Sequence, residues 1–283
     1  MPALPENRSP TPGDAARWTD LRKRALSAAI LAPAVLVCIW AGGIPYKVMM
    51  VAAALGLAWE WIGLCGNVPT QMPGKLVAVA VVAGSFAGAM GYVGAGFAIF
   101  ATGTVFTAAL AGGTPHWRAL ASGIPYTGIG AMALLWLRDD AEHGLENLLF
   151  VLLLVWGSDI GAYITGRLLG GPKLAPRISP GKTWSGALGG LVTAMAVGLA
   201  VAYLFHTFAQ PVRVAAIAGG LGIVAQAGDL LESMLKRQFG AKDSGNLIPG
   251  HGGLLDRLDA LLIAAPVAAL LAQIAGRGVV LWQ

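Results

Sequence analysis

Acidic and polar side chains gather in residues 228–259 of a chain that is otherwise mainly apolar. Asp229, Glu232, Ser233 and Lys236 follow one another at i, i+3, i+4 and i+7, which places them on one face of an α-helix. Ionisable groups are costly to place in lipid and persist where they pair with each other or line a polar cavity. This face is therefore predicted to point into the protein.

A second pair of acids, Asp256 and Asp259, opens the next apolar run, after the sharp turn PGHGG at 249–253. Basic side chains stand between or beside the acids: Lys236, Arg237, Lys242 and Arg257. Carboxylates converging from two helices suit a hard cation such as Mg²⁺, which takes oxygen ligands and often shares them with phosphates. The basic side chains suit the phosphate oxygens themselves. The pattern predicts phosphoryl or nucleotidyl transfer, in which positioning and charge neutralisation supply most of the catalysis.

Structural interpretations of these residues stay open at this point. The same acids and bases could form a buried salt-bridge network that only locks two helices together. His251 could make either a structural hydrogen bond or a phosphate contact. Glu60, between Trp59 and Trp61 in another apolar run, could serve a structural pairing or a function. Asp159, also in an apolar run, needs a partner inside the protein, and the sequence assigns it no role.

A second polar stretch, residues 156–186, contains the sequence ISPGKTWSG. Ser179, Lys182 and Thr183 within it are natural partners for phosphate oxygens. The letters GKT imitate the end of a P-loop, but a P-loop needs glycine where Pro176 stands and a strand before it. We therefore predict a phosphate contact here without a P-loop fold.

Composition indicates that membrane helices position these segments. Of 283 residues, 56% are hydrophobic and 12% are charged, against about 25% charged in a soluble domain. Runs of roughly the 20 apolar residues that cross a bilayer recur along the chain. They lie at about 25–42, 45–65, 75–91, 94–111, 119–137, 146–169, 185–207, 212–235 and 257–276. The sequence predicts an all-α polytopic integral membrane protein of about nine transmembrane helices, and the uneven spread of its net charge of +5 argues against a nucleic-acid partner.

Charge and proline content orient this predicted bundle. Residues 1–20 carry several prolines among polar residues and are expected to form a disordered cytoplasmic leader before a single transmembrane catalytic domain, residues 21–283. Basic residues before the first apolar run and along alternate loops favour a cytoplasmic N-terminus. On that topology the loops 170–184 and 236–256 face the same compartment, so the two polar segments can meet.

These segments resemble the phosphatidate cytidylyltransferase family, whose members are also called CDP-diacylglycerol synthases. The resemblance rests on GDL at 228–230 and on SMLKRQFGAKDSGNLIPGHGGLLDRLD at 233–259, which match the family signature at its fixed positions. The stretch around ISPGKTWSG is similar to the family's form Ser-Pro-x-Lys-Thr-x-Glu-Gly, except that Ser185 stands where glutamate is common. We therefore assign no acid role at that position.

The resemblance implies an enzyme of the bacterial-type inner membrane that transfers CMP from CTP to phosphatidic acid at the cytoplasmic face and releases pyrophosphate. It implies Mg²⁺ (a second cation is left open), surrounding membrane lipid, and a homodimer. The expected metal ligands are Asp229, Asp256 and Asp259. The expected catalytic residues are Ser233, Lys236, Arg237, Asp256 and Asp259. The expected substrate- and phosphate-binding residues are Ser179, Lys182, Thr183, Lys242, His251 and Arg257.

Three other activities fit the sequence less well. Transfer of CDP-alcohol groups needs the pattern Asp-Gly-x-x-Ala-Arg, which this sequence lacks. A transporter is expected to show internal repeats and helices broken at mid-membrane, whereas the acids here cluster at one membrane face. A CTP-dependent lipid kinase is the closer rival, because its site would also join Mg²⁺, CTP and a lipid. The kinase would release CDP, whereas a cytidylyltransferase leaves cytidine on the lipid.

Overall fold

The computed structural model describes residues 12–67, 70–205, 210–276 and 278–283. In these ranges the chain forms nine α-helices and one two-stranded hairpin. Their bounds are α1 Pro12–Ala41, α2 Gly43–Leu64, α3 Gly74–Ala89, α4 Val93–Ala111, α5 Trp117–Arg138, α6 Gly144–Leu169, β1 Lys173–Ala175, β2 Ser179–Thr183, α7 Trp184–Leu204, α8 Pro211–Gln238 and α9 Leu255–Ala275.

The helices coincide with the nine predicted apolar runs. Within the described ranges, eight of them are long and apolar enough to cross a membrane. The other, α3, has 16 residues and so extends about 24 Å, less than the roughly 30 Å of a hydrocarbon core. The prediction of an all-α membrane protein with about nine helices is confirmed.

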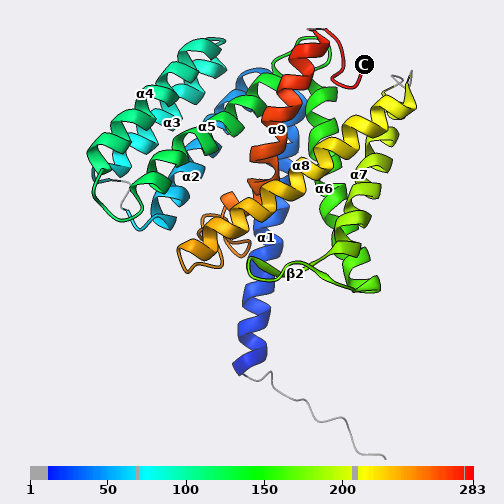
Figure 1. Ribbon diagram of the computed structural model, residues 1–283, viewed down its shortest axis with the longest axis horizontal. Coiled ribbons are helices and arrows are strands. Elements are labelled where there is room, and N and C mark those ends of the chain that lie inside the picture. Colours follow the sequence, from blue (N-terminus) through cyan, green and yellow to red (C-terminus); the bar gives the residue numbers. More distant parts are fainter. Residues whose placement is uncertain (1–11, 68–69, 206–209, 277) are drawn as a thin grey trace, which may run out of the picture.

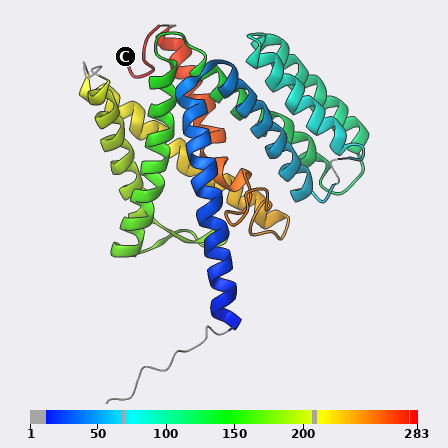
Figure 2. The same cartoon turned by 180° about the vertical axis from the view of Figure 1, so that it is seen from behind.

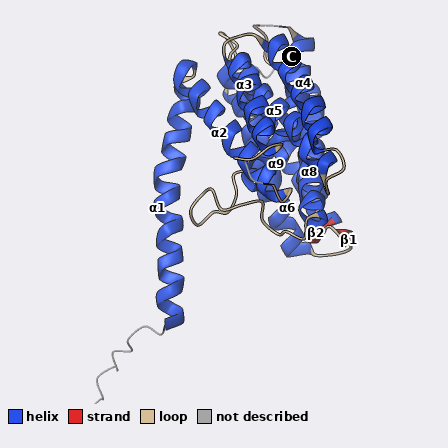
Figure 3. Ribbon diagram, turned by 90° about the vertical axis from the view of Figure 1, so that its left-hand side faces the viewer, coloured by secondary structure: helices blue, strands red, loops and turns tan. Residues whose placement is uncertain are grey.

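Helix α1 begins earlier than its apolar run. Residues 1–20 are expected from their composition to lack fixed structure, but α1 starts at Pro12; residues 1–11 lie outside the described ranges. Proline is favoured at a first helical position because its backbone angle is already helical, and alanine, leucine and arginine are good helix formers. α1 stands at the edge of the molecule, where it packs against α2 (Figure 3).

The other helices form two groups joined by α9 (Figures 1 and 2). α2, α3, α4 and α5 pack together on one side, while α6 packs along α7 and α7 against α8 on the other. α9 lies between the groups and contacts α5, α6 and α8. The acid-bearing helices α8 and α9 therefore contact one another at the junction of the two groups.

The hairpin of β1 and β2 connects α6 to α7 and positions the second polar segment. β1 pairs antiparallel with β2, with Lys173 opposite Thr183. Thr183 is the N-cap of α7, and its hydroxyl accepts a hydrogen bond from the Gly186 amide at 3.1 Å. α7 approaches α6 so closely that a β-carbon at position 186 would lie 2.9 Å from the carbonyl oxygen of Ala162. The glycine therefore permits the packing that fixes the end of the hairpin.

Candidate active site

The two polar segments of the sequence meet in the structure. Lys182, on β2, places its ammonium nitrogen 2.5 Å from a carboxylate oxygen of Asp229 on α8. Both side chains line a cavity of about 440 Å³ bounded by the hairpin, α6, α7 and α8. Arg237, near the end of α8, donates a hydrogen bond to the Ile178 carbonyl oxygen at 3.3 Å. The prediction that the two polar segments can meet is confirmed, and their forming one active site stays a prediction.

Two further acids surround Asp229. Asp159 lines the same cavity from α6, and both Asp159 and Asp259 interact electrostatically with Asp229. Lys182 is an attractive charge for Asp159 as well as for Asp229. Asp159 has no predicted role, although its place inside an apolar run signals a polar environment. Asp159 and Asp229 line the cavity, and Asp259 interacts with Asp229 from α9; we call these three acids the cavity cluster.

A second group lies further along α8 and forms a buried network. The ammonium nitrogen of Lys236 lies 2.5 Å from Glu232 and 2.7 Å from Oδ1 of Asp256. The side chain of Glu232 is only 1% exposed. Oδ2 of Asp256 accepts hydrogen bonds from the backbone amides of Ser244, at 3.0 Å, and Gly253, at 3.1 Å. Lys236 and Asp256 thus join the end of α8, the loop that follows and the start of α9. The salt-bridge network left open as an alternative is present here, beside the cavity.

Other predicted site residues hold the loops in place. The hydroxyl of Ser233 donates to Asp229 at 3.5 Å. Arg257 donates two hydrogen bonds to the carbonyl oxygen of His251, at 3.0 and 2.6 Å. The hydroxyl oxygen of Ser27, on α1, lies 3.0 Å from Nδ1 of His251. His251 thus makes a structural hydrogen bond, one of its two expected roles, and its phosphate contact stays a prediction.

The remaining predicted phosphate-binding residues differ in accessibility. Thr183 is buried, and its hydroxyl caps α7. Ser179 is half-buried in β2, whereas Lys242 is exposed in the loop after α8. Ser185, where the resembling family commonly has glutamate, donates a hydrogen bond to the Gly170 carbonyl oxygen and so braces the hairpin. The phosphate contacts predicted for Ser179, Thr183 and Lys242 stay predictions.

The predicted metal ligands fall into the two groups just described. Within the described ranges, His, Cys, Asp and Glu side chains form no group of three or more that could hold a metal ion. Asp229 and Asp259 interact with one another in the cavity cluster, whereas Asp256 is bonded to Lys236 and to backbone amides. Mg²⁺ in phosphate chemistry is usually held by one or two carboxylates together with substrate phosphates. Asp229, which is paired with Lys182, and Asp259 fit that number of ligands, and the ligand assignment stays a prediction.

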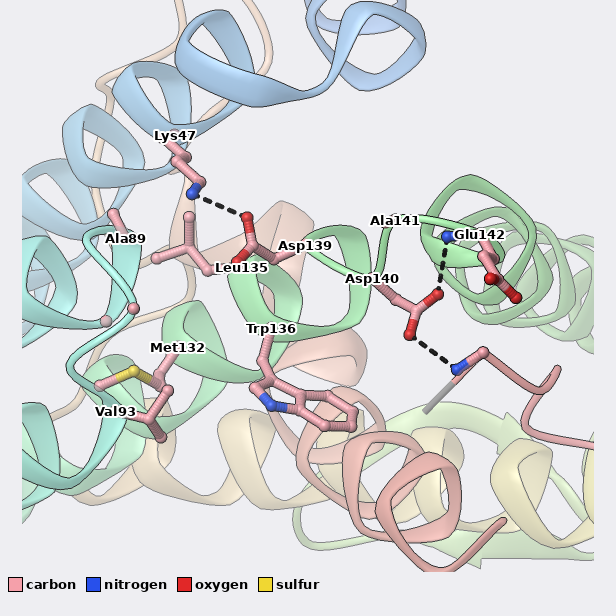
Figure 4. Close-up of a pocket in the computed structure, with 13 residues that line it drawn as sticks. Lys47, Ala89, Val93, Met132, Leu135, Trp136, Asp139, Asp140, Ala141 and Glu142 are labelled. Atoms are coloured by element: carbon pink, nitrogen blue, oxygen red, sulfur yellow. Dashed lines mark hydrogen bonds and ion pairs between the residues drawn. The ribbon is translucent and has the colours of Figure 1, made fainter. Parts of the chain in front are cut away.

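A separate cavity of about 420 Å³ lies at the other end of the bundle (Figure 4). Met132, Leu135 and Trp136 line it beside Lys47, whose ammonium nitrogen lies 2.7 Å from Asp139. α6 begins beside this cavity and ends at the hairpin. The α6 residues that line the first cavity begin at Asp159, well after the helix starts at Gly144, so roughly 22 Å of helix separate the two cavities.

Asp140 fastens the end of the chain to this second cavity. Its carboxylate accepts hydrogen bonds from the backbone amides of Glu142 at 3.0 Å and Gly278 at 3.1 Å (Figure 4). It also accepts one from the backbone amide of His143 at 2.8 Å. Burial alone raises the pKa of Asp140, but these hydrogen bonds outweigh it and lower the pKa below its ordinary value. The lowered pKa keeps Asp140 ionised as an anchor, so this acid has a structural purpose.

Replacing Lys47 with alanine is expected to leave enzymatic activity within about twofold of wild type. The ion pair of Lys47 with Asp139 is far from the cavity cluster, and the Asp139 side chain is 48% exposed, so its loss costs about 1 kcal/mol of stability or less. Activity per milligram of purified variant, together with its thermal unfolding midpoint, checks this. A large loss of activity would instead connect the second cavity to the reaction.

Known proteins similar to this chain agree on one activity. The chain matches the model of the Cytidylyltransferase family over residues 22–275. It is 41% identical over 267 residues to a protein named phosphatidate cytidylyltransferase from Brucella suis biovar 1 (strain 1330), an alignment covering 89% of this chain and 93% of that protein. A protein of the same name from Pseudomonas aeruginosa is 37% identical over 272 residues, covering 91% of this chain and 99% of that protein. The residues matched by the family model contain both polar segments.

Proposed function

The chain belongs to the cytidylyltransferase family, and we propose that the cavity between the hairpin and α8 is the place where it joins CTP to phosphatidic acid. The protein is an integral membrane nucleotidyltransferase of phospholipid biosynthesis, which makes CDP-diacylglycerol from CTP and phosphatidate. One observation supports the location of the site. The contact of Lys182 with Asp229 brings two polar segments, distant in the sequence, to one cavity.

The reaction needs charge neutralisation more than proton transfer. A phosphate oxygen of phosphatidic acid attacks the α-phosphorus of CTP and forms a new oxygen–phosphorus bond. The bond from the α-phosphorus to the oxygen it shares with the β-phosphate breaks, and pyrophosphate leaves with that electron pair. Because the attacking oxygen is already anionic, no general base is assigned. Lys182 lies in the cavity and would bind triphosphate oxygens, with Arg237 and Lys242 on the neighbouring segment.

We propose that Lys236 acts mainly through the residues it holds. Its ammonium group is already bonded to Glu232 and Asp256, so its positive charge is largely matched by two carboxylates. Its contribution is to fix Asp256, and with it the backbone amides of the loop between α8 and α9. Ser233 would similarly orient Asp229 toward the cavity.

We propose that the enzyme requires Mg²⁺ bound together with CTP. Asp229 and Asp259 would hold the ion, and Asp256 is the third predicted ligand. When bound, the ion neutralises charge on the phosphates that react and leave. The carboxylates of the cavity cluster would otherwise repel the triphosphate, so ion and nucleotide are expected to bind together.

We also propose that the site faces the cytoplasm and that the enzyme is a homodimer. The relatives are bacterial, and the basic residues Lys173 and Arg177 lie on the hairpin beside the site. Loops rich in positive charge favour the cytoplasmic side of a membrane.

Apolar side chains, including Ile160, Leu168 and Leu188, are exposed on α6 and α7. These faces would meet lipid or a second copy, while the phosphatidic acid headgroup enters sideways and its acyl chains stay in lipid.

The direct test is to incubate the purified protein with CTP labelled in cytidine, phosphatidic acid and Mg²⁺. Label is expected in the extracted lipid, with release of an equal amount of pyrophosphate. A lipid kinase would instead leave labelled CDP in solution and no label in lipid. Omitting phosphatidic acid is the control, and label that stays in the aqueous phase in both samples would overturn the proposal.

Removing divalent cations with EDTA is expected to lower the rate of this reaction by about 100-fold or more, because unneutralised phosphates repel the carboxylates of the cavity. Added Mg²⁺ should restore the rate, and the Asp229→Asn variant should need a higher Mg²⁺ concentration than wild type for half of its own maximal rate. Undiminished label in lipid after exhaustive chelation would contradict a metal requirement.

A further inference from the structure

Glu60, an acid inside helix α2, reaches into the loop between α8 and α9. Its residue is only 4% exposed. Oε2 accepts hydrogen bonds from the Leu255 amide, at 2.8 Å, and from the Ser244 hydroxyl, at 3.4 Å. Oε1 accepts one from the Leu247 amide at 3.3 Å. One carboxylate thus holds three donors from this loop and from the start of α9.

Two glycines of the loop leave room for this carboxylate. A β-carbon at Gly245 would lie 2.7 Å from Oε1 of Glu60, and one at Gly253 would lie 2.9 Å from Oε2. Neither glycine has a left-handed backbone, because the positive-φ glycines near them are Gly250 and Gly252. The absence of a side chain at 245 and 253 therefore serves the close approach of Glu60 and not an unusual backbone angle.

Glu60 also supplies what the start of α9 needs. The first amides of a helix lack partners within the helix and favour negative charge. Leu254, the N-cap residue of α9, provides no side-chain hydrogen bond, whereas Glu60 accepts from the amide of Leu255, the first residue of the helix. Asp256 follows immediately and accepts from the Ser244 and Gly253 amides. Glu60 on α2 and Asp256 on α9 therefore both accept hydrogen bonds from the loop between α8 and α9.

We propose that Glu60 is a positioning residue of the active site, which fixes the loop between α8 and α9 and the start of α9 so that Asp256 and Lys236 hold their places beside the cavity. The inference rests on the proposed location of the active site. Glu60 acts through backbone amides and one hydroxyl, and it need not touch CTP, lipid or metal.

The variant Glu60→Gln tests this role in the full-length protein. In either orientation of the new amide, its NH₂ group faces a backbone amide where an acceptor stood. We expect kcat/KM for CTP to fall about 10- to 100-fold and hydrogen exchange to accelerate in the peptide covering 244–255, with exchange in α6 and α7 unchanged. Asn147→Leu is the matched control, because buried Asn147 accepts a backbone hydrogen bond from Leu281 at 2.8 Å at the other end of the bundle. It should retain activity within about twofold.

A second pair of variants keeps the proposal testable if Glu60→Gln folds poorly. Gly245→Ala should impair wild type, since its β-carbon would clash with Glu60, but should be milder in a Glu60→Asp background, where the carboxylate is shorter by one methylene. Additive effects of the two substitutions would overturn the contact.

Each result of the exchange experiment has one meaning. Faster exchange at 244–255 together with lower activity supports positioning. Lower activity with unchanged exchange would show that Glu60 contacts substrate or metal directly, and unchanged activity would show that the reaction does not need it; both overturn the inference. A wild-type protein that leaves lipid unlabelled would instead refute the proposed function, while the exchange rates still report on the Glu60 contact.

Discussion

Replacing Asp256 with asparagine is expected to lower kcat/KM for CTP by a factor on the order of 1000, with the protein still folded in the membrane. Asp256 accepts one hydrogen bond from Lys236 and others from the Ser244 and Gly253 amides. Asparagine replaces one acceptor oxygen with an NH₂ group, which then faces either the ammonium group or the backbone amides. These bonds hold Lys236 and the loop in place, so their loss acts through position: misplaced site residues cost about 100-fold in rate, and loss of a carboxylate predicted to hold the metal adds to it.

The fold itself should survive this substitution. Glu232 and Lys236 still form a neutral pair when Asp256 loses its charge, so no uncompensated buried charge is created. Incorporation of cytidine label into lipid measures the loss. Asp139→Asn, the same chemical change on the rim of the second cavity, is the control and should stay near wild type. An Asp256→Asn enzyme with near-normal turnover would remove Asp256 from the site.

The helices could be predicted from the sequence because each depends on a local property. A bilayer requires a run of apolar residues of a certain length, and such runs are visible without knowledge of the partner helices. The start of α1 could not be predicted in this way. Residues 12–24 are polar and follow a proline-rich stretch, so composition suggested no structure, whereas local helix propensity and continuity with the apolar run extend the helix to Pro12.

The part of the site that could be predicted is the set of residues spaced at helical intervals along α8. Asp229, Glu232 and Lys236 recur on one face of α8, and the structure divides that face between the cavity cluster and the buried network. The sequence left Glu60 open between a structural pairing and a function, and spacing could not reveal its partners, because they lie in a loop far along the sequence. It also could not show that Thr183 caps a helix, since a capping threonine and a phosphate-binding threonine look alike in sequence.

Lys182→Met is expected to lower kcat/KM for CTP by up to about 1000-fold, with KM for CTP rising, because a cation facing phosphate oxygens in a preorganised site is worth about that much. Asp229→Asn should instead act mainly on kcat and on the Mg²⁺ concentration required. The two side chains are 26% and 31% exposed, so their ion pair alone contributes about 1 kcal/mol or less to stability. Unfolding midpoints of both variants should therefore stay close to wild type.

The double variant separates a structural ion pair from a pair that serves substrates. If Lys182 and Asp229 only neutralise one another, removing both should restore much of the activity that either single change removes. If Lys182 binds the triphosphate and Asp229 binds the metal, the double variant should be no more active than the less active of the two single variants. Recovery of activity in the double variant would contradict the proposed roles of Lys182 in binding triphosphate and of Asp229 in binding metal. The physical basis is that Lys182 and Asp229 neutralise one another at 2.5 Å before substrate binds. When CTP and the metal bind, Lys182 can pair with a phosphate and Asp229 with the cation, so each charge keeps a partner of opposite sign.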